Sequence, residues 1–392
     1  MSAVPRVSIG ELVNPVASWT PERDDPDGAF TYIDLSAVDQ DAKAITGARR
    51  LACADAPSRA RQLVCGDDVL VSTVRPNLNA VARVPQELSG ATASTGFCVV
   101  RPRPERLNSG YLFHWVRSPH FVGEMVRLAT GASYPAVSER IVLDSKVPVP
   151  SLPEQRRIAE ILDTADSLRA MRRAGFAQLD TLPQSVFLDM FGDPATNPKG
   201  WPKASLEELF EIARGGSPRP IDDYITDDPD GINWIMIGDT VAGGKYITST
   251  KKRIRPEGAR RSRAVKPGDF LLTNSMSFGR PYIMRTSGCI HDGWLVLSPR
   301  RDDVEPHYFY ALLGTQAVYA EFARRAPGAT VKNLNIDLVR SVTVPLPPLP
   351  TQKKFAAIVA SIEGGASTFT RSLAELDALF TSLQECAFRG EL

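Results

Sequence analysis

Apolar residues follow a helical period in two long stretches of the chain, residues 150–190 and residues 347–392. Steps of three and four residues place them along one side of a helix, and a repeat close to seven is typical of a coiled-coil seam. We therefore predict two helices, each about 45–50 Å long, that pair with each other. The residues expected to pair them are Ile158, Ile161, Leu168, Leu179 and Leu182 in the first helix, and Phe355, Ile358, Ile362, Leu373 and Leu376 in the second.

The two helical stretches begin with the same short motif, which indicates an internal duplication. Leu152, Pro153 and Gln155 recur 197 positions later as Leu349, Pro350 and Gln352. A period this long is not that of a solenoid, whose repeats have tens of residues. It indicates a duplicated unit made of one domain and one helix. The alternative is two unrelated amphipathic helices, each lying on its own domain, and the shared motif argues against it.

The rest of the chain predicts two mixed domains of short strands and few helices, an α+β organisation. Strand-like runs such as Asp68–Thr73 follow glycine-containing turns, and residues 111–128 predict a helix broken near Pro119. Gly66-Asp67 recurs as Gly268-Asp269, 202 positions later. The predicted boundaries are 1–149 for the first domain, 150–190 for the central helix, 191–204 for a linker, 205–346 for the second domain and 347–392 for the C-terminal helix.

Length and composition narrow the class of protein. A chain of 392 residues exceeds one hydrophobic core, and its 43% hydrophobic content is ordinary for a globular protein. We find no run of about 20 apolar residues that would predict a membrane span and no signal-peptide pattern. Five cysteines without paired spacing are typical of a reducing compartment. We therefore expect a cytoplasmic protein without a membrane partner.

One segment of the second domain is strongly basic. Residues 245–266 hold nine lysines and arginines and a single acidic residue, Glu257, which leaves a charge of +8. A merely solvated surface would normally mix both signs, so we predict a loop that follows nucleic-acid phosphates. The candidate phosphate contacts are Lys251, Lys252, Arg253, Arg255, Arg260, Arg261 and Arg263.

Reading a base sequence needs side chains that pair donors with acceptors or present a bidentate fork. Such side chains occur in loops at matching places of the two domains, although a turn or capping role is an equal alternative for each. The candidates are Arg75, Asn77, Asn79, Ser133 and Tyr134 in the first domain, and Asn274, Ser277, Arg280, Lys332 and Asn333 in the second.

No catalytic pattern of comparable strength is present. The four histidines and five cysteines show no metal-ligand spacing, and Gly243-Gly244-Lys245 lacks the remainder of a phosphate-binding loop. Pro26-Asp27 followed by Asp41-Ala42-Lys43 fits a nuclease-like acidic pattern, but so short a pattern often arises by chance. We predict a chain without its own active site, metal or cofactor.

Together these residues give a chain that resembles the specificity subunits of type I restriction–modification enzymes. The resemblance covers nearly the whole length and depends on LPEQRRIAEILD (152–163), GDDVLVSTVRPNLNAVA (66–82) and GDFLLTNSMSFGRPYI (268–283). It implies two tandem mixed α/β target-recognition domains, each followed by a long helix, with the helices paired as an antiparallel coiled coil of pseudo-two-fold symmetry. The sequence departs from the family pattern at Thr351 and at Gly364-Gly365.

The same resemblance implies a function. Each domain would read one half of a bipartite double-stranded DNA target. The helices would set the gap and dock two modification (methyltransferase) subunits, to which restriction subunits are added. S-adenosylmethionine, ATP and Mg would then be bound by those partners and not by this chain. Two other classes remain as alternatives: a metal-dependent nuclease that uses the aspartates near residues 24–41, and a protein scaffold that does not read DNA.

Overall fold

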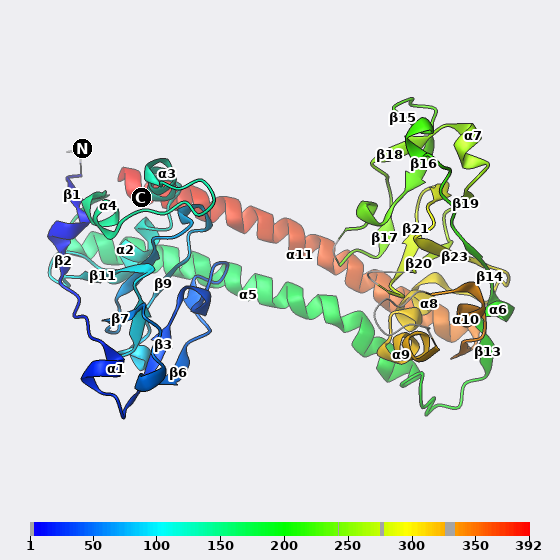
Figure 1. The fold of residues 1–392 in the computed structure, drawn as a ribbon, viewed down its shortest axis with the longest axis horizontal. Coiled ribbons are helices and arrows are strands. Elements are labelled where there is room, and N and C mark those ends of the chain that lie inside the picture. Colours follow the sequence, from blue (N-terminus) through cyan, green and yellow to red (C-terminus); the bar gives the residue numbers. More distant parts are fainter. Residues whose placement is uncertain (1–3, 242, 275–277, 326–333) are drawn as a thin grey trace. The chain divides into compact units, whose positions relative to one another are not determined.

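The computed structural model of the chain describes residues 4–241, 243–274, 278–325 and 334–392 (Figure 1). It divides into two compact units, Met1–Gly175 with Phe369–Leu392, and Phe176–Thr368. Each unit therefore contains one mixed domain and one part of each long helix. These helices are α5 (Leu152–Phe191) and α11 (Leu349–Arg389), whose 40 and 41 residues correspond to about 60 Å each. They are longer than the sequence pattern predicts.

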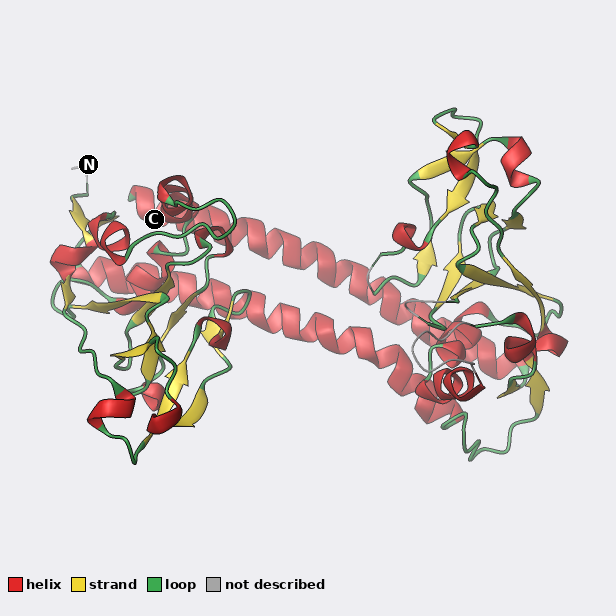
Figure 2. Cartoon of the chain, in the orientation of Figure 1, coloured by secondary structure: helices red, strands yellow, loops and turns green. Residues whose placement is uncertain are grey.

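In the first unit the domain contains two four-stranded sheets (Figure 2). One has the order β6-β3-β10-β7 and the other the order β2-β11-β8-β9. Their strands are β2 (Val13–Asn14), β3 (Ala29–Ile33), β6 (Arg49–Ala52), β7 (Ala60–Leu63), β8 (Val69–Ser72), β9 (Val81–Arg83), β10 (Thr92–Ser94) and β11 (Phe97–Pro102). A further pair joins β1 (Arg6–Ser8) to β12 (Lys146–Pro148), and β4 (Val38–Asp39) pairs with β5 (Ala44–Ile45). The domain is thus closed by pairing its first strand with the strand that precedes α5.

In the second unit the domain repeats this plan with two five-stranded sheets. Their orders are β15-β18-β16-β22-β19 and β14-β23-β20-β21-β17. The strands are β14 (Phe210–Arg214), β15 (Ile225–Thr226), β16 (Ile232–Ile235), β17 (Tyr246–Ile247), β18 (Lys252–Ile254), β19 (Arg263–Val265), β20 (Phe270–Thr273), β21 (Pro281–Met284), β22 (Gly288–Ile290) and β23 (Trp294–Pro299). Again the first strand, β13 (Lys203–Ser205), pairs with the last, β24 (Thr343–Pro345).

Nine short helices are described beside the sheets. The predicted break near Pro119 is confirmed, because α2 ends at Trp115 and α3 begins at Pro119. A proline fits the first turn of a helix, where its missing N–H costs nothing. The short helices are α1 (Pro21–Asp24), α2 (Ser109–Trp115), α3 (Pro119–Leu128), α4 (Glu139–Asp144), α6 (Leu206–Leu209), α7 (Pro256–Ala259), α8 (Pro306–Leu313), α9 (Gln316–Arg325) and α10 (Ile336–Arg340). Among the described residues, no helix is both long and apolar enough to cross a membrane.

Each domain core is completed by both long helices. In the first unit Ile158 of α5 and Phe388 of α11 join the same buried cluster, where the Phe388 ring lies 5.3 Å from the ring of Tyr111. In the second unit Phe355 of α11 and Phe191 of α5 do the same, with ring centroids 5.5 Å apart. The helices therefore run antiparallel, since the start of one lies beside the end of the other in each unit.

The shared Leu-Pro-x-Gln motif has a structural explanation. Gln155 and Gln352 are both fully buried and make the same three hydrogen bonds. Gln155 Oε1 accepts from the Asn108 N–H, and its Nε2 donates to the carbonyls of Arg106 and Pro150. Gln352 repeats these contacts with residues 197 positions later, namely Glu305, Asp303 and Pro347. A buried amide that satisfies three backbone groups fixes each helix start onto its domain.

The alignment of the Gly-Asp turn needs a correction of one residue. Asp68 accepts from the Cys65 N–H as Asp269 accepts from the Lys266 N–H, which gives an offset of 201 and not 202. Asp67, at φ +66°, then stands where the second domain has Gly268 at φ +94°. Aspartate is one of the few residues that tolerate this left-handed conformation, so the turn survives without glycine.

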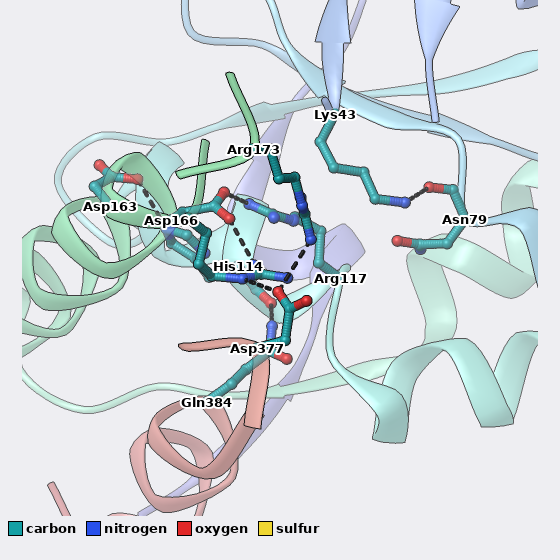
Figure 3. A network of polar contacts seen from close by, with 10 residues as sticks. Lys43, Asn79, His114, Arg117, Asp163, Asp166, Arg173, Asp377 and Gln384 are labelled. Atoms are coloured by element: carbon teal, nitrogen blue, oxygen red, sulfur yellow. Dashed lines mark hydrogen bonds and ion pairs between the residues drawn. The ribbon is translucent and has the colours of Figure 1, made fainter. Parts of the chain in front are cut away.

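The helix pairing is less apolar than its sequence pattern predicts. Leu168 is 47% exposed and Leu182 is 39% exposed, while Ile158 and Phe355 belong to domain cores. In the first unit, charged side chains lie between the helices (Figure 3). Arg169 and Arg173 of α5 both reach Asp377 of α11, over 2.6 and 3.0 Å. The apolar period identifies the helices correctly but does not identify all the residues that hold them together.

Candidate nucleic-acid interface

The sequence predicted a loop at the basic segment of the second domain, residues 245–266, and this prediction is wrong. It contains strand β17 of one sheet, and then strand β18, helix α7 and strand β19, of which both strands belong to the sheet β15-β18-β16-β22-β19. Exposure falls along β18, from the exposed Lys252 through the half-buried Arg253 to the fully buried Ile254. Lys252 and Arg253 therefore stand on a strand between β15 and β16, and Arg263 stands on the edge strand β19.

Not every cation of this segment faces solvent. Lys245 Nζ donates to Glu363 Oε1 of α11 at 2.7 Å. Lys251 donates to the carbonyl of Gly238, and Arg253 donates to the carbonyl of Pro229 at 2.6 Å. The side chain of Arg261 is exposed and lies over the ring of Tyr224. The other exposed candidates are Lys252, Arg255, Arg260 and Arg263.

A cleft of about 670 Å³ opens beside Lys252. Its apolar wall includes Trp234 and Met236, and its polar lining includes Arg219 and His291. Burial lowers the pKa of His291, and Asp292 opposes that effect. Sequence reasoning did not propose this cleft; the only signal was the run Gly215-Gly216-Ser217-Pro218, which has no counterpart in the first domain.

In the first domain the structure brings two candidate loops together. The Arg75 N–H donates to the carbonyl of Pro135, and the Arg75 guanidinium lies 4.9 Å from the ring centre of Tyr134. Tyr134 is 70% exposed, and Asn77 and Ser133 are exposed as well. Arg75 and Tyr134 thus bring a positive charge and an aromatic ring together, on loops that also carry the exposed Asn77 and Ser133, and this combination suits stacking on and hydrogen bonding to nucleic acid.

Two asparagines in the candidate set have structural partners. Asn274 is only 2% exposed, and its Nδ2 donates to the carbonyl of Asp292. The Asn274 N–H donates to the carbonyl of Gly293, and the Asn274 carbonyl accepts from the Leu334 N–H. Thr73 makes the same two backbone hydrogen bonds in the first domain, to Gly96 and from Val137. The structure corrects our interpretation of Asn274, which is a buried scaffold residue and not an exposed reader.

Asn79 is half-buried, and its Nδ2 donates to the carbonyl of Val116 at 2.9 Å. Arg280 is also half-buried; its guanidinium lies 5.3 Å from the ring centre of Tyr282, beside a pocket lined by residues of α8 and α9. The remaining candidates, Ser277, Lys332 and Asn333, lie outside the described residues.

The nuclease-like residues form local structure. The Asp39 carboxylate accepts from the N–H groups of Asp41 and Ala42, which forms a turn. Lys43 Nζ donates to the carbonyl of Asn79, and burial, followed by the charge of Arg117, lowers the Lys43 pKa to about 8. No group of three or more acidic, histidine or cysteine side chains placed to hold a metal occurs within the part of the chain that the structure describes.

Two tandem domains share one plan, and each packs against both long helices. The model of the type I restriction modification DNA specificity domain matches residues 63–174 and again residues 198–376. The chain therefore belongs to the type I restriction–modification DNA specificity family. It is a recognition subunit and not a catalytic one, with the predicted architecture of two recognition domains and packed long helices.

Comparison with individual proteins agrees with this assignment. The chain is 23% identical over 330 residues to the EcoBI specificity subunit of Escherichia coli, which covers 75% of this chain and 68% of that one. A solved structure that describes complex assembly and conformational transition of the type I R-M system matches with a TM-score of 0.71 and 27% identity, over 100% of this chain and 99% of that one. The S subunit from M. genitalium shares the fold, with a TM-score of 0.55 and 14% identity, over 98% of this chain and 96% of that one.

Proposed function

We propose that each domain reads one half of a bipartite double-stranded DNA target. The observation that carries this proposal is the group of exposed cations on and beside β18, α7 and β19 of the second domain, because closely spaced positive charges suit a phosphate backbone. The cluster of Arg75, Asn77, Ser133 and Tyr134 supports a separate reading surface on the first domain. Two domains of one plan but different surfaces would read two different half-sites.

The paired helices would set the distance between the half-sites and dock two modification subunits. Leu168, Met171 and Leu182 of α5 are 47%, 60% and 39% exposed, and their spacing places them on one side of that helix. Exposed apolar residues in such a row are typical of a partner surface. Restriction subunits would join the complex, and S-adenosylmethionine, ATP and Mg would act in those partners. Such a complex would work in the cytoplasm, where the DNA of the cell is.

The proposal is tested by mapping methylated positions across the DNA of cells that express this chain with its modification partner. Two double variants separate the domains: Arg75→Ala with Tyr134→Ala, and Lys252→Ala with Arg263→Ala. We expect the first double variant to relax the sequence preference of methylation at one half-site. We expect the second to weaken methylation because the complex binds DNA with lower affinity. Loss of sequence preference at both halves in the first variant would contradict two independent readers. Undetectable binding of duplex DNA by the assembled complex would instead support a protein scaffold.

A further inference from the structure

The strand pairings place cations of the first domain at the same positions as the basic strand of the second. Tyr32 and Trp234 are equivalent, since Tyr32 pairs with Thr92 as Trp234 pairs with Cys289, both in parallel register. Across the next strand, Tyr32 faces Arg49 and Trp234 faces Lys252. One step along, Thr31 faces Arg50 and Asn233 faces Arg253. Strand β6 is therefore the counterpart of strand β18, with a cation at both positions.

In both strand pairs, β3 with β6 and β16 with β18, acidic residues lie at one end and basic residues at the other. The turns before β3 and β16 have the same sequence, Asp-Asp-Pro-Asp-Gly, at residues 24–28 and 227–231. In both, the glycine N–H donates over 3.0 Å to the carbonyl of the second aspartate, Asp25 or Asp228. These exposed acidic turns precede Ala29 and Ile232, so they lie at the end of the strand pair away from Arg49 and Lys252. A phosphate backbone would be repelled at one end and attracted at the other.

Arg49 and Arg50 differ in how freely their guanidinium groups could bind a phosphate. Arg49 donates to Asp34 Oδ2 at 2.6 Å, and 60% of its side chain is exposed. Arg50 is exposed and has no ion-pair partner among the described residues. Since successive residues of a strand point to opposite faces, Arg50 stands on the face opposite to Arg49. Arg50 is therefore the cation of this strand that a phosphate can reach without displacing an internal carboxylate.

Resting on the function proposed above, we propose that strand β6 is a DNA-backbone contact surface of the first domain, with Arg50 as its main phosphate ligand. We assign this surface to the phosphodiester backbone because its counterpart, β18, lies in the basic segment of the second domain. It complements the Arg75–Tyr134 surface, whose mixed chemistry suits base edges. Each domain thus holds its half-site through a basic strand placed at the same point of the same sheet.

The test measures duplex binding by the complex of this chain with its modification subunits, over a range of salt concentrations. A duplex with the methylation-mapped target is the probe. The variants are Arg50→Ala in the first domain, Lys252→Ala in the second, and Arg140→Ala as a control for net charge, because the Arg140 side chain is 89% exposed in the short helix α4. We expect the slope of log K against log salt to fall by about one for Arg50→Ala and to stay unchanged for Arg140→Ala.

Duplexes with neutral methylphosphonates in one half-site then locate the contact. Neutralising one half should remove the effect of Arg50→Ala alone, and neutralising the other should remove the effect of Lys252→Ala alone. An Arg50→Ala complex with the slope of the unchanged protein would overturn the proposal. Failure of the proposed function looks different, since the unchanged complex would then bind target and scrambled duplexes equally.

Discussion

Arg169 of α5 and Asp377 of α11 form an ion pair in the first unit, with Nε and Oδ1 2.6 Å apart. The Arg169 side chain is only 12% exposed, lies 4.3 Å from the ring centre of Phe380 and also bonds Asp166. A planar guanidinium can serve two carboxylates and a ring face at once, which an ammonium cannot. This contact, and not a leucine, joins the helices at this level.

Replacing Asp377 with alanine should therefore loosen the first unit. We expect a loss of about 1 kcal/mol, because Asp377 is partly exposed and Arg169 keeps Asp166. The melting temperature should fall by about 2–4 °C at low salt and by less at high salt. The control is Glu375→Ala, an exposed residue of the same helix. Equal effects of the two variants would contradict a specific role for Asp377.

The buried glutamines give a second prediction. Gln155→Ala leaves one N–H and two carbonyls buried without their partner, which should cost about 3 kcal/mol. Gln352→Ala should cost a similar amount in the other unit. Limited proteolysis with mapped cleavage sites distinguishes them, since each variant should open its own unit first. Gln178→Ala, at an exposed position of α5, should change neither pattern. First cleavage in the opposite unit would contradict the assignment of each glutamine to its domain.

His114 predicts how stability depends on pH. Its ring is fully buried, and Nε2 lies 2.8 Å from Asp163 Oδ1 (Figure 3). Burial lowers the pKa of His114 below its ordinary value of 6.5, and its bond to Asp163 only partly opposes this effect. The unfolded chain therefore binds a proton at a pH where the folded chain does not. Stability should fall as pH drops below about 6.5, by up to about 1.4 kcal/mol per pH unit from this residue.

The measurement compares the free energy of unfolding between pH 5 and 8 for the unchanged chain and for His114→Phe. The phenylalanine keeps the ring contact with Phe380 and has no proton to bind. We expect a shallower pH dependence for that variant. A variant that keeps the full slope would show that other groups cause it.

The sequence predicted the repeat, the two long helices and the family, but it predicted individual contacts less well. The Leu-Pro-x-Gln motif marks a position with three fixed hydrogen bonds, so it recurs and can be recognised. Leu168 follows the same apolar period as Ile158, yet it is exposed while Ile158 enters a domain core. A period shows which side of a helix is apolar but not what covers it. Asn274 likewise has a side chain of a type that can hydrogen-bond to a base, and only the fold shows that it is buried.

The two arginines of β6 show a related limit. Arg49 and Arg50 are flanked by small and apolar residues in the sequence, so no run of positive charges marks them. Their position becomes informative only when the register of β3 with β6 is compared with that of β16 with β18. Pairing between strands distant in sequence carries this information, and local patterns do not contain it.

The proposed spacing role of the helices predicts the effect of lengthening both. A Cβ placed on Gly175 would lie 3.3 Å from the ring of Phe369, so these positions face each other. Seven helix-forming residues inserted after Gly175 and seven before Phe369 keep the seven-residue period and lengthen each helix by about 10 Å. At about 3.4 Å per base pair, the unspecified gap in the target should grow by about three base pairs. Methylation mapping gives the new gap directly.

Four residues inserted in α5 alone should abolish methylation, because they shift its pairing against α11. A doubly extended chain that still methylates the original target would show that the helices do not set the gap.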